Sequence, residues 1–314
     1  MRNNNIIIIE NPSELGAGTR GAATGPIAVR LADNQGENKI YGKIEHTTIK
    51  SRNEALCKPV TTPHAKYVAD IYEHNQEVVK TIKKQLLDQK FPLIISGDHS
   101  NAIGSIAAIK DTFPNKRLGV IWIDAHADLH TPYTSPSGNM HGMPLGVSLG
   151  EGYQTTPVNI PQPETIDYWH KLTHLGENQI HPKLLPTDLV FISIRDLEEP
   201  EWEDIEDNHI KHFVPARLLN KSMSDVAAET LEYLNQCDHI YISFDVDSMD
   251  PSVSTGTGTS VENGLTLPEA KNLLQSLMQS PKIVSLEITE INPLIDHQNK
   301  MAQVTLDILS HLLQ

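Results

Sequence analysis

Potential metal ligands alternate with alanine where an apolar run of the chain ends, in Ile121-Trp122-Ile123-Asp124-Ala125-His126-Ala127-Asp128. Because side chains alternate across a β-strand, Asp124, His126 and Asp128 would project from one face as the strand opens into its loop. Carboxylate and imidazole groups at this spacing form a metal-binding edge. The alternative is a set of solvated polar residues just past a strand.

Two further apolar runs end in the same kinds of residue. The run His239–Asp245 places Asp245 and Asp247 on one face, and the run Pro92–Ser96 is followed closely by His99. Carboxylates at the ends of core strands are costly unless cations pair with them, and open α/β sheets bind ligands at the carboxyl ends of their strands. We therefore expect the three segments to converge in one crevice.

The charges of these residues indicate how many cations the crevice would hold. Its four aspartates supply four negative charges and its two histidines supply neutral nitrogens, so two divalent ions would balance the site and one would not. Two ions also suit a bridging hydroxide, because metals lower the pKa of bound water. Ligation without thiolate favours manganese over a structural zinc site. Asp98 is expected to cap the next helix or to support a ligand, not to bind metal.

Short apolar runs alternate with helical patterns, and these elements must position the ligands. Apolar strands separated by helices predict a mainly parallel sheet covered on both faces, in a single α/β domain over residues 1–314. The polar, Pro-rich stretch at about 150–186 is predicted to be a long irregular loop insertion. The predicted strands are Ile6–Ile9, Pro92–Ser96, Leu118–Asp124, Leu189–Ile194, His239–Asp245 and Ile283–Ile288, and the predicted helices lie near Ala65–Gln89, Asn101–Lys110, Ser222–Asn235, Leu267–Met278 and Gln298–Leu313.

Composition narrows the class of protein. The chain has 314 residues and a net charge of −15, which argues against a nucleic-acid partner and agrees loosely with a cationic small substrate. Cys57 and Cys237 have no close partner in sequence and are interpreted as reduced, buried thiols of a cytoplasmic protein. The run Ile6–Ile9 is too short to span a bilayer and lacks the form of a secretory signal, so we expect no membrane partner.

The ligand-bearing segments resemble the ureohydrolase superfamily, which includes arginases, agmatinases and formiminoglutamases. The resemblance rests on Gly97-Asp98-His99-Ser100, Asp124-Ala125-His126-Ala127-Asp128 and Ser243–Pro251, and it covers essentially the whole chain apart from 150–186. It implies a three-layer α/β/α fold with two Mn²⁺ ions per chain. The ligands that it implies are His99, Asp124, His126, Asp128, Asp245 and Asp247.

Within that superfamily, Ser135–Gly142 is similar to a loop of arginases in which Ser137 and Asn139 would hold the substrate's α-carboxylate. The same match implies three catalytic residues. His141 would shuttle a proton to the leaving amine, Glu290 would pair with the guanidinium group, and Asp128 would assist the nucleophile's proton. The other substrate contacts that the match implies are His126, Ala127, His130, Asp196, Glu198, Glu201 and Thr259.

The resemblance therefore implies a manganese-dependent arginase that hydrolyses L-arginine to L-ornithine and urea by attack of a metal-bridging hydroxide. Arginases often have Asn at the position of His130 and Asp at that of Glu198, and these departures bear on the substrate more than on the reaction. The alternatives are another ureohydrolase, acting on agmatine, a guanidino acid or formiminoglutamate; a catalytically silent metal-binding homologue; and a mononuclear zinc amidohydrolase. The resemblance also implies a homo-oligomer, a trimer or a hexamer.

Overall fold

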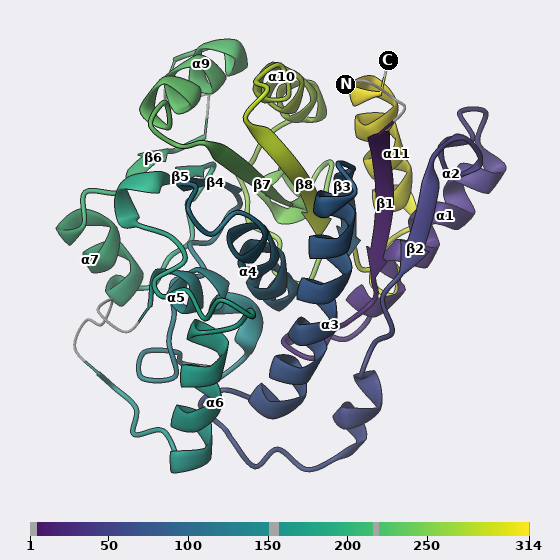
Figure 1. Cartoon of the computed structure of the whole chain (residues 1–314). Coiled ribbons are helices and arrows are strands. Elements are labelled where there is room, and N and C mark those ends of the chain that lie inside the picture. Colours follow the sequence, from purple (N-terminus) through teal and green to yellow (C-terminus); the bar gives the residue numbers. More distant parts are fainter. Residues whose placement is uncertain (1–4, 151–156, 216–219, 314) are drawn as a thin grey trace.

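The computed structural model describes residues 5–150, 157–215 and 220–313. In this part of the chain, eight parallel strands form one sheet in the order β2-β1-β3-β8-β7-β4-β5-β6 (Figure 1). The predicted parallel sheet is confirmed. The strands are β1 (Ile6–Asn11), β2 (Glu45–Thr48), β3 (Phe91–Ser96), β4 (Leu118–Ile123), β5 (Leu189–Ile192), β6 (Lys211–Phe213), β7 (His239–Asp245) and β8 (Ile283–Thr289).

Helices cover both faces of the sheet, because the inner strands are apolar on both sides. In β1, Ile6 and Ile8 join a core with α1, α9, α10 and α11, whereas Ile7 and Ile9 join a second core with α3, α4 and α6. This alternation follows from the two-residue period of a strand, and it confirms the three-layer α/β/α arrangement. The helices are α1 (Gly25–Gln35), α2 (Ile40–Lys43), α3 (Val68–Leu87), α4 (Ala102–Thr112), α5 (Pro144–Leu149), α6 (Pro163–Thr173), α7 (Glu199–Asp207), α9 (Met223–Tyr233), α10 (Leu267–Leu277) and α11 (Lys300–Leu312).

The strand order brings four chain segments to one edge of the sheet. Strands β3, β8, β7 and β4 are consecutive neighbours, although β7 and β8 come last in the sequence. Their carboxyl ends lead into His99, Glu290, Asp245 and Asp124 respectively. Parallel strands all end at the same edge, so these residues meet there.

Two strands, β2 and β6, were not predicted because they form the edges of the sheet and lack an apolar run. Strand β2 is Glu45-His46-Thr47-Thr48 and is largely exposed, and β6 has only three residues. An edge strand buries little of its surface, so it needs no continuous apolar run.

The 150–186 stretch is less irregular than predicted. It contains α6, which begins at Pro163 and buries Trp169 and Leu172 against the second core. The helix was missed because its few apolar residues are spaced among polar ones. Residues 151–156 of the stretch lie outside the described residues.

The prediction for the two cysteines is half right. Cys237 is buried but Cys57 is exposed, and both are free thiols. Among the described residues, no helix has the length and apolar character that crossing a membrane requires.

Candidate metal centre and substrate pocket

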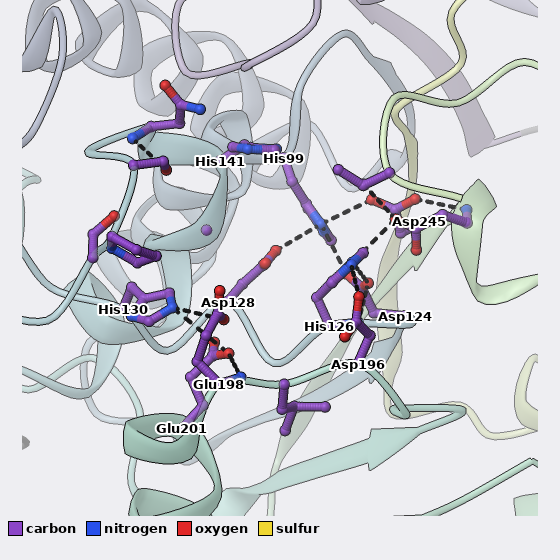
Figure 2. A pocket seen from close by; sticks show the side chains of 18 residues that line it. His99, Asp124, His126, Asp128, His130, His141, Asp196, Glu198, Glu201 and Asp245 are labelled. Atoms are coloured by element: carbon purple, nitrogen blue, oxygen red, sulfur yellow. Dashed lines mark hydrogen bonds and ion pairs between the residues drawn. The ribbon is translucent and has the colours of Figure 1, made fainter. Parts of the chain in front are cut away.

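The first group of candidate ligands surrounds the imidazole of His99, which follows β3. Its Nδ1 atom lies 3.1 Å from Asp124 Oδ2, 3.0 Å from Asp128 Oδ2 and 3.2 Å from Asp245 Oδ2 (Figure 2). All four side chains are buried. Three carboxylates from the ends of β4 and β7 thus face one ring nitrogen.

The second group surrounds His126, in the loop after β4. Its Nδ1 atom lies 3.4 Å from Asp124 Oδ1 and 3.1 Å from Asp247 Oδ2. Asp124 therefore belongs to both groups and presents one oxygen to each imidazole. A carboxylate that two cations share has this arrangement.

Local turns aim the carboxylates. Asp124 Oδ1 accepts the backbone N–H of His126 at 2.8 Å, and Asp245 Oδ1 accepts that of Asp247 at 2.8 Å, so in both residues Oδ2 remains to face His99. Asp128 has a φ of 52°, a left-handed conformation that is strained for a residue with a side chain. Such strain persists where the surroundings impose it, and it is common at functional sites.

The chemistry of the two groups fits divalent cations. Neither His99 Nδ1 nor Asp124 Oδ2 has a hydrogen-bond partner among the described residues, although both atoms are buried. Ligands placed at right angles about 2.1 Å from a cation lie about 3 Å apart, which is the spacing of these atoms. Burial and nearby carboxylates raise the pKa of Asp128, Asp245 and Asp247, so cations would favour their ionised forms. The groups together form a binuclear metal site.

Two residues that the sequence patterns did not single out hold His99 in place. Ser243 Oγ lies 2.7 Å from His99 Nε2, and the indole of Trp122 stacks on the imidazole with ring centroids 4.1 Å apart and planes 7° apart. Ser243 stands two residues before Asp245, and Trp122 two before Asp124. The period of two that identified the ligands places these residues on the same faces, and that signal was available in the sequence.

A cavity of about 320 Å³ opens over the metal site. Most of the predicted substrate contacts line it, whereas Ala127 is fully buried in the second core. Glu290 lies beside the cavity, against His141. The predicted site residues that line the cavity are His99, Asp124, His126, Asp128, His130, Ser137, Asn139, His141, Asp196, Glu198, Glu201, Asp245, Asp247 and Thr259.

His141 and Glu290 form a pair between the loop after β4 and the end of β8. His141 Nδ1 lies 3.5 Å from Glu290 Oε1, which also accepts the backbone N–H of His99 at 2.9 Å. Burial disfavours the imidazolium form of His141, but Glu290, Asp128 and Asp98 outweigh it and raise the pKa of His141. The imidazole is therefore suited to carrying a proton near neutral pH.

A second histidine joins two loops at the other side of the cavity. His130 Nε2 lies 3.0 Å from Glu198 Oε2 and 3.7 Å from Glu201 Oε2 (Figure 2). These three residues could also hold a cation, but both oxygens of Glu201 already accept backbone N–H groups, from Leu129 and Glu198, at 3.2 Å. His130 lowers the pKa of Glu198 to about 2, and burial raises that of Glu201 to about 8. We assign no cation to this group.

The loop that carries Ser137 and Asn139 is held in a tight turn. Gly138 has a φ of 70°, and a Cβ atom there would lie 1.8 Å from the carbonyl oxygen of Pro63. Ser137 Oγ accepts the backbone N–H of Asn139 at 3.1 Å, and Lys66 Nζ donates to Asn139 Oδ1 at 2.9 Å. Lys66 was not predicted, because no local pattern marks a residue that reaches so distant a loop.

The remaining predicted residues contact the metal site or its supports. Thr259 Oγ1 donates to Asp247 Oδ2 at 2.9 Å, and Asp196 Oδ2 lies 3.8 Å from His126 Nε2. Asp98 accepts the backbone N–H of Ser100 at 2.7 Å and caps the short helix His99–Asn101, so it is a helix cap as predicted, but of the helix that precedes α4 and not of the one expected from Asn101 onward.

Comparison with known proteins places the chain in a family. The model of the arginase family matches residues 4–314. The chain is 34% identical to the arginase of Bacillus subtilis (strain 168), over 98% of the chain and 97% of that relative. A crystal structure of arginase from Bacillus subtilis subsp. subtilis str. 168 superimposes with a TM-score of 0.81 at 33% identity, covering 98% of both chains. The structure of Entamoeba histolytica arginase in complex with L-ornithine gives a TM-score of 0.84 at 28% identity, covering 100% of this chain and 99% of that one. With this full-length match and the binuclear metal site, the chain belongs to the arginase family.

Proposed function

We propose that this chain hydrolyses L-arginine to L-ornithine and urea with two Mn²⁺ ions. The observation that carries the proposal is the sharing of Asp124 between two groups of imidazole and carboxylate ligands. Full-length membership of the arginase family supports the choice of substrate. The complex of the Entamoeba histolytica relative with L-ornithine agrees with it.

Six residues would hold the cations. His99, Asp128 and Asp245 would bind the first ion, His126 and Asp247 the second, and Asp124 both. Manganese is favoured because all six ligands offer oxygen or imidazole nitrogen and none offers sulfur. When bound, the two cations would lower the pKa of a water molecule and so supply a nucleophile near neutral pH.

Three side chains would act on the reacting group. Glu290 would orient the guanidinium, whose N–H groups a carboxylate accepts. Asp128, which lines the cavity and faces His99, would accept a proton from the nucleophile. His141 would deliver a proton to the leaving amine, and its raised pKa supports this role because it keeps the imidazolium populated.

Polar residues at the outer part of the cavity would hold the amino-acid end of the substrate. Hydroxyl, amide and imidazole groups suit the α-carboxylate, and carboxylates suit the α-ammonium group. The proposed contacts are Ser137, Asn139 and His130 for the carboxylate, Asp196, Glu198 and Glu201 for the ammonium group, and His126, Thr259 and the backbone of Ala127 along the chain of the substrate.

A substrate panel tests the proposal. Initial rates of urea release from L-arginine and from agmatine would be measured with manganese, with cobalt and after chelation, together with metal content by elemental analysis. We expect turnover of L-arginine with manganese and two ions per chain. Turnover of agmatine in preference to L-arginine would contradict the substrate, and full activity with one ion per chain would contradict the binuclear mechanism.

We also propose that the chain forms a homo-oligomer, a trimer or a hexamer, because arginases commonly associate in this way. Light scattering on the eluted peak of a sizing column tests this, and the mass of a single chain would contradict it.

A further inference from the structure

A fully buried carboxylate lies in β8 below the metal site. Glu287 accepts hydrogen bonds from Tyr241 Oη at 2.7 Å, from Ser105 Oγ at 2.5 Å and from Ser96 Oγ. All four residues have 0% relative exposure, and the three donors come from β7, α4 and β3. An ionisable group in the core of a sheet costs free energy that an apolar residue of similar size would not, so a carboxylate here calls for an explanation.

The hydroxyl of Ser243 connects this cluster to the metal site. Ser243 Oγ lies 2.7 Å from His99 Nε2, and Ser243 is the neighbour of Glu287 in the register of β7 and β8. Tyr241, two residues earlier on the same face of β7, donates to Glu287; burial and Glu287 raise the pKa of Tyr241, and the nearby hydroxyl of Ser243 offsets part of that rise. Polar groups on β7 therefore lie between the imidazole of His99 and the carboxylate of Glu287, with Ser243 next to His99 and Tyr241 next to Glu287.

The direction of the hydrogen bonds along this path follows from the ligand site. His99 Nδ1 faces three carboxylate oxygens, so as a metal ligand it carries no proton, and Nε2–H donates to Ser243 Oγ. The hydroxyl of Ser243 is then free to donate toward Tyr241, and Tyr241 donates to Glu287. Where each hydroxyl accepts from one neighbour and donates to the next, the hydrogen bonds strengthen one another.

We propose that Glu287 is a positioning residue for the metal centre, which acts through Tyr241 and Ser243 to fix the orientation and tautomer of His99. Stacking on Trp122 holds the plane of the imidazole but does not distinguish the two orientations related by a half-turn of the ring. The hydrogen bond to Ser243 does distinguish the two orientations, because a flipped ring would place a carbon atom against that hydroxyl. Partners of this kind orient ligand histidines and raise their basicity. The proposal rests on the two-cation site of the proposed function.

Manganese titration of the metal-free protein tests it, with free Mn²⁺ measured by electron paramagnetic resonance. Glu287→Gln keeps the shape and removes the charge, and we expect it to weaken one of the two sites by about 10- to 100-fold and to leave the other nearly unchanged. Tyr241→Phe deletes only the hydroxyl and should weaken the same site. Ser285→Ala is the matched control: Ser285 is buried on the same face of β8, but it donates to the carbonyl oxygen of Pro92 at 2.9 Å and has no link to His99.

A double variant separates positioning from general damage. Ser243→Ala breaks the same path, so its effect on affinity and that of Glu287→Gln should be markedly less than additive. Unchanged affinities in both Glu287→Gln and Tyr241→Phe would overturn the proposal, as would an equal loss in Ser285→Ala at the same melting temperature. If Glu287→Gln does not fold, Tyr241→Phe decides. A wild-type chain that binds fewer than two ions would overturn the proposed function as well.

Discussion

The imidazole of His130 and the carboxylate of Glu198 form an ion pair, with 3.0 Å between Nε2 and Oε2, that joins the loop after β4 to the start of α7. Both residues line the cavity over the metal site. The pair lies where arginases often have Asn and Asp, so it is the place where the proposed substrate contacts of this chain differ from the family pattern.

Glu198→Gln should therefore alter substrate binding more than the chemical step. We expect a KM for L-arginine about tenfold higher, with kcat within about twofold, because a contact far from the reacting carbon is made equally in the ground and transition states. Steady-state urea release measures both constants. Glu203→Gln, exposed on the same helix, is the control. A lower kcat at unchanged KM would place Glu198 at the chemistry instead.

His141→Gln should lower kcat by about 10²- to 10⁴-fold, the usual contribution of a general acid, while both cations still bind. The pKa of His141 is raised above 6.5, so in the wild type the imidazolium persists to more alkaline pH and is lost as pH rises through that pKa. We expect kcat to fall with it. A rate profile of the variant that keeps the same alkaline fall would assign the proton to another group.

Removal of the cations should destabilise the folded chain. A ligand at 100 times its Kd stabilises by about 2.7 kcal/mol, so chelation should lower the melting temperature by about 5 °C or more, and added Mn²⁺ should restore it. Burial and neighbouring carboxylates raise the pKa of Asp245 above 3.8 in the metal-free chain. Lowering the pH toward 3.8 protonates such groups in the folded metal-free chain and stabilises it. The difference in melting temperature between the metal-bound and the metal-free chain should therefore become smaller. A difference in melting temperature that increases on acidification would contradict this account.

Gly138→Ala should disturb the loop that presents Ser137 and Asn139. At a φ of 70°, with Pro63 O in the way of a Cβ atom, alanine should cost about 1–2 kcal/mol from backbone strain and more from the clash. We expect a lower melting temperature and a higher KM. Gly36→Ala is the matched control, because Gly36 has a φ of −75° and its Cβ would make an ordinary contact with Ala32 O at 3.5 Å. Equal losses in both variants would refute the role of the turn.

His74 should make stability sensitive to acid. Burial lowers the pKa of His74 from 6.5 to about 4. Between pH 6.5 and pH 4, His74 is therefore protonated in the unfolded chain but not in the folded chain. Stability is full above 6.5 and is lost as pH falls toward 4, by about 2 kcal/mol at pH 5. His74→Gln should remove this part of the loss of folding stability at acid pH, as measured by guanidinium chloride unfolding at pH 7 and pH 5. The same acid sensitivity in the variant would assign it to other residues.

The sequence predicts which side chains gather around His99 and His126, because much of the relevant geometry is local. Asp124 directly follows the apolar strand β4 and Asp245 ends the apolar strand β7, and in both a turn of the chain places the next ligand two residues later. That β3, β8, β7 and β4 are neighbours in the sheet is not local, and the sequence patterns do not predict this strand order.

What the sequence misses lies in long-range contacts. Lys66 supports Asn139, and Glu287 gathers hydroxyls from three elements, but neither stands in a motif. Glu287 does leave one signal in the sequence, because it is an ionisable residue inside the apolar run of β8. That signal could have marked Glu287 as a buried polar group with a special role. Cys57 is a free thiol as expected but is exposed and not buried. The number and spacing of cysteines indicate the redox state of a thiol, but they do not indicate its burial.

The two strands at the middle of the sheet, β7 and β8, are the last to leave the ribosome. A nascent chain that has emerged only through β6 has a gap between β3 and β4, and it lacks Asp245 and Asp247. Sheet pairing between segments so distant in sequence is slow, and domains generally fold as units. We therefore expect cation capture to wait for synthesis of nearly the whole chain, so that truncated products would carry no metal.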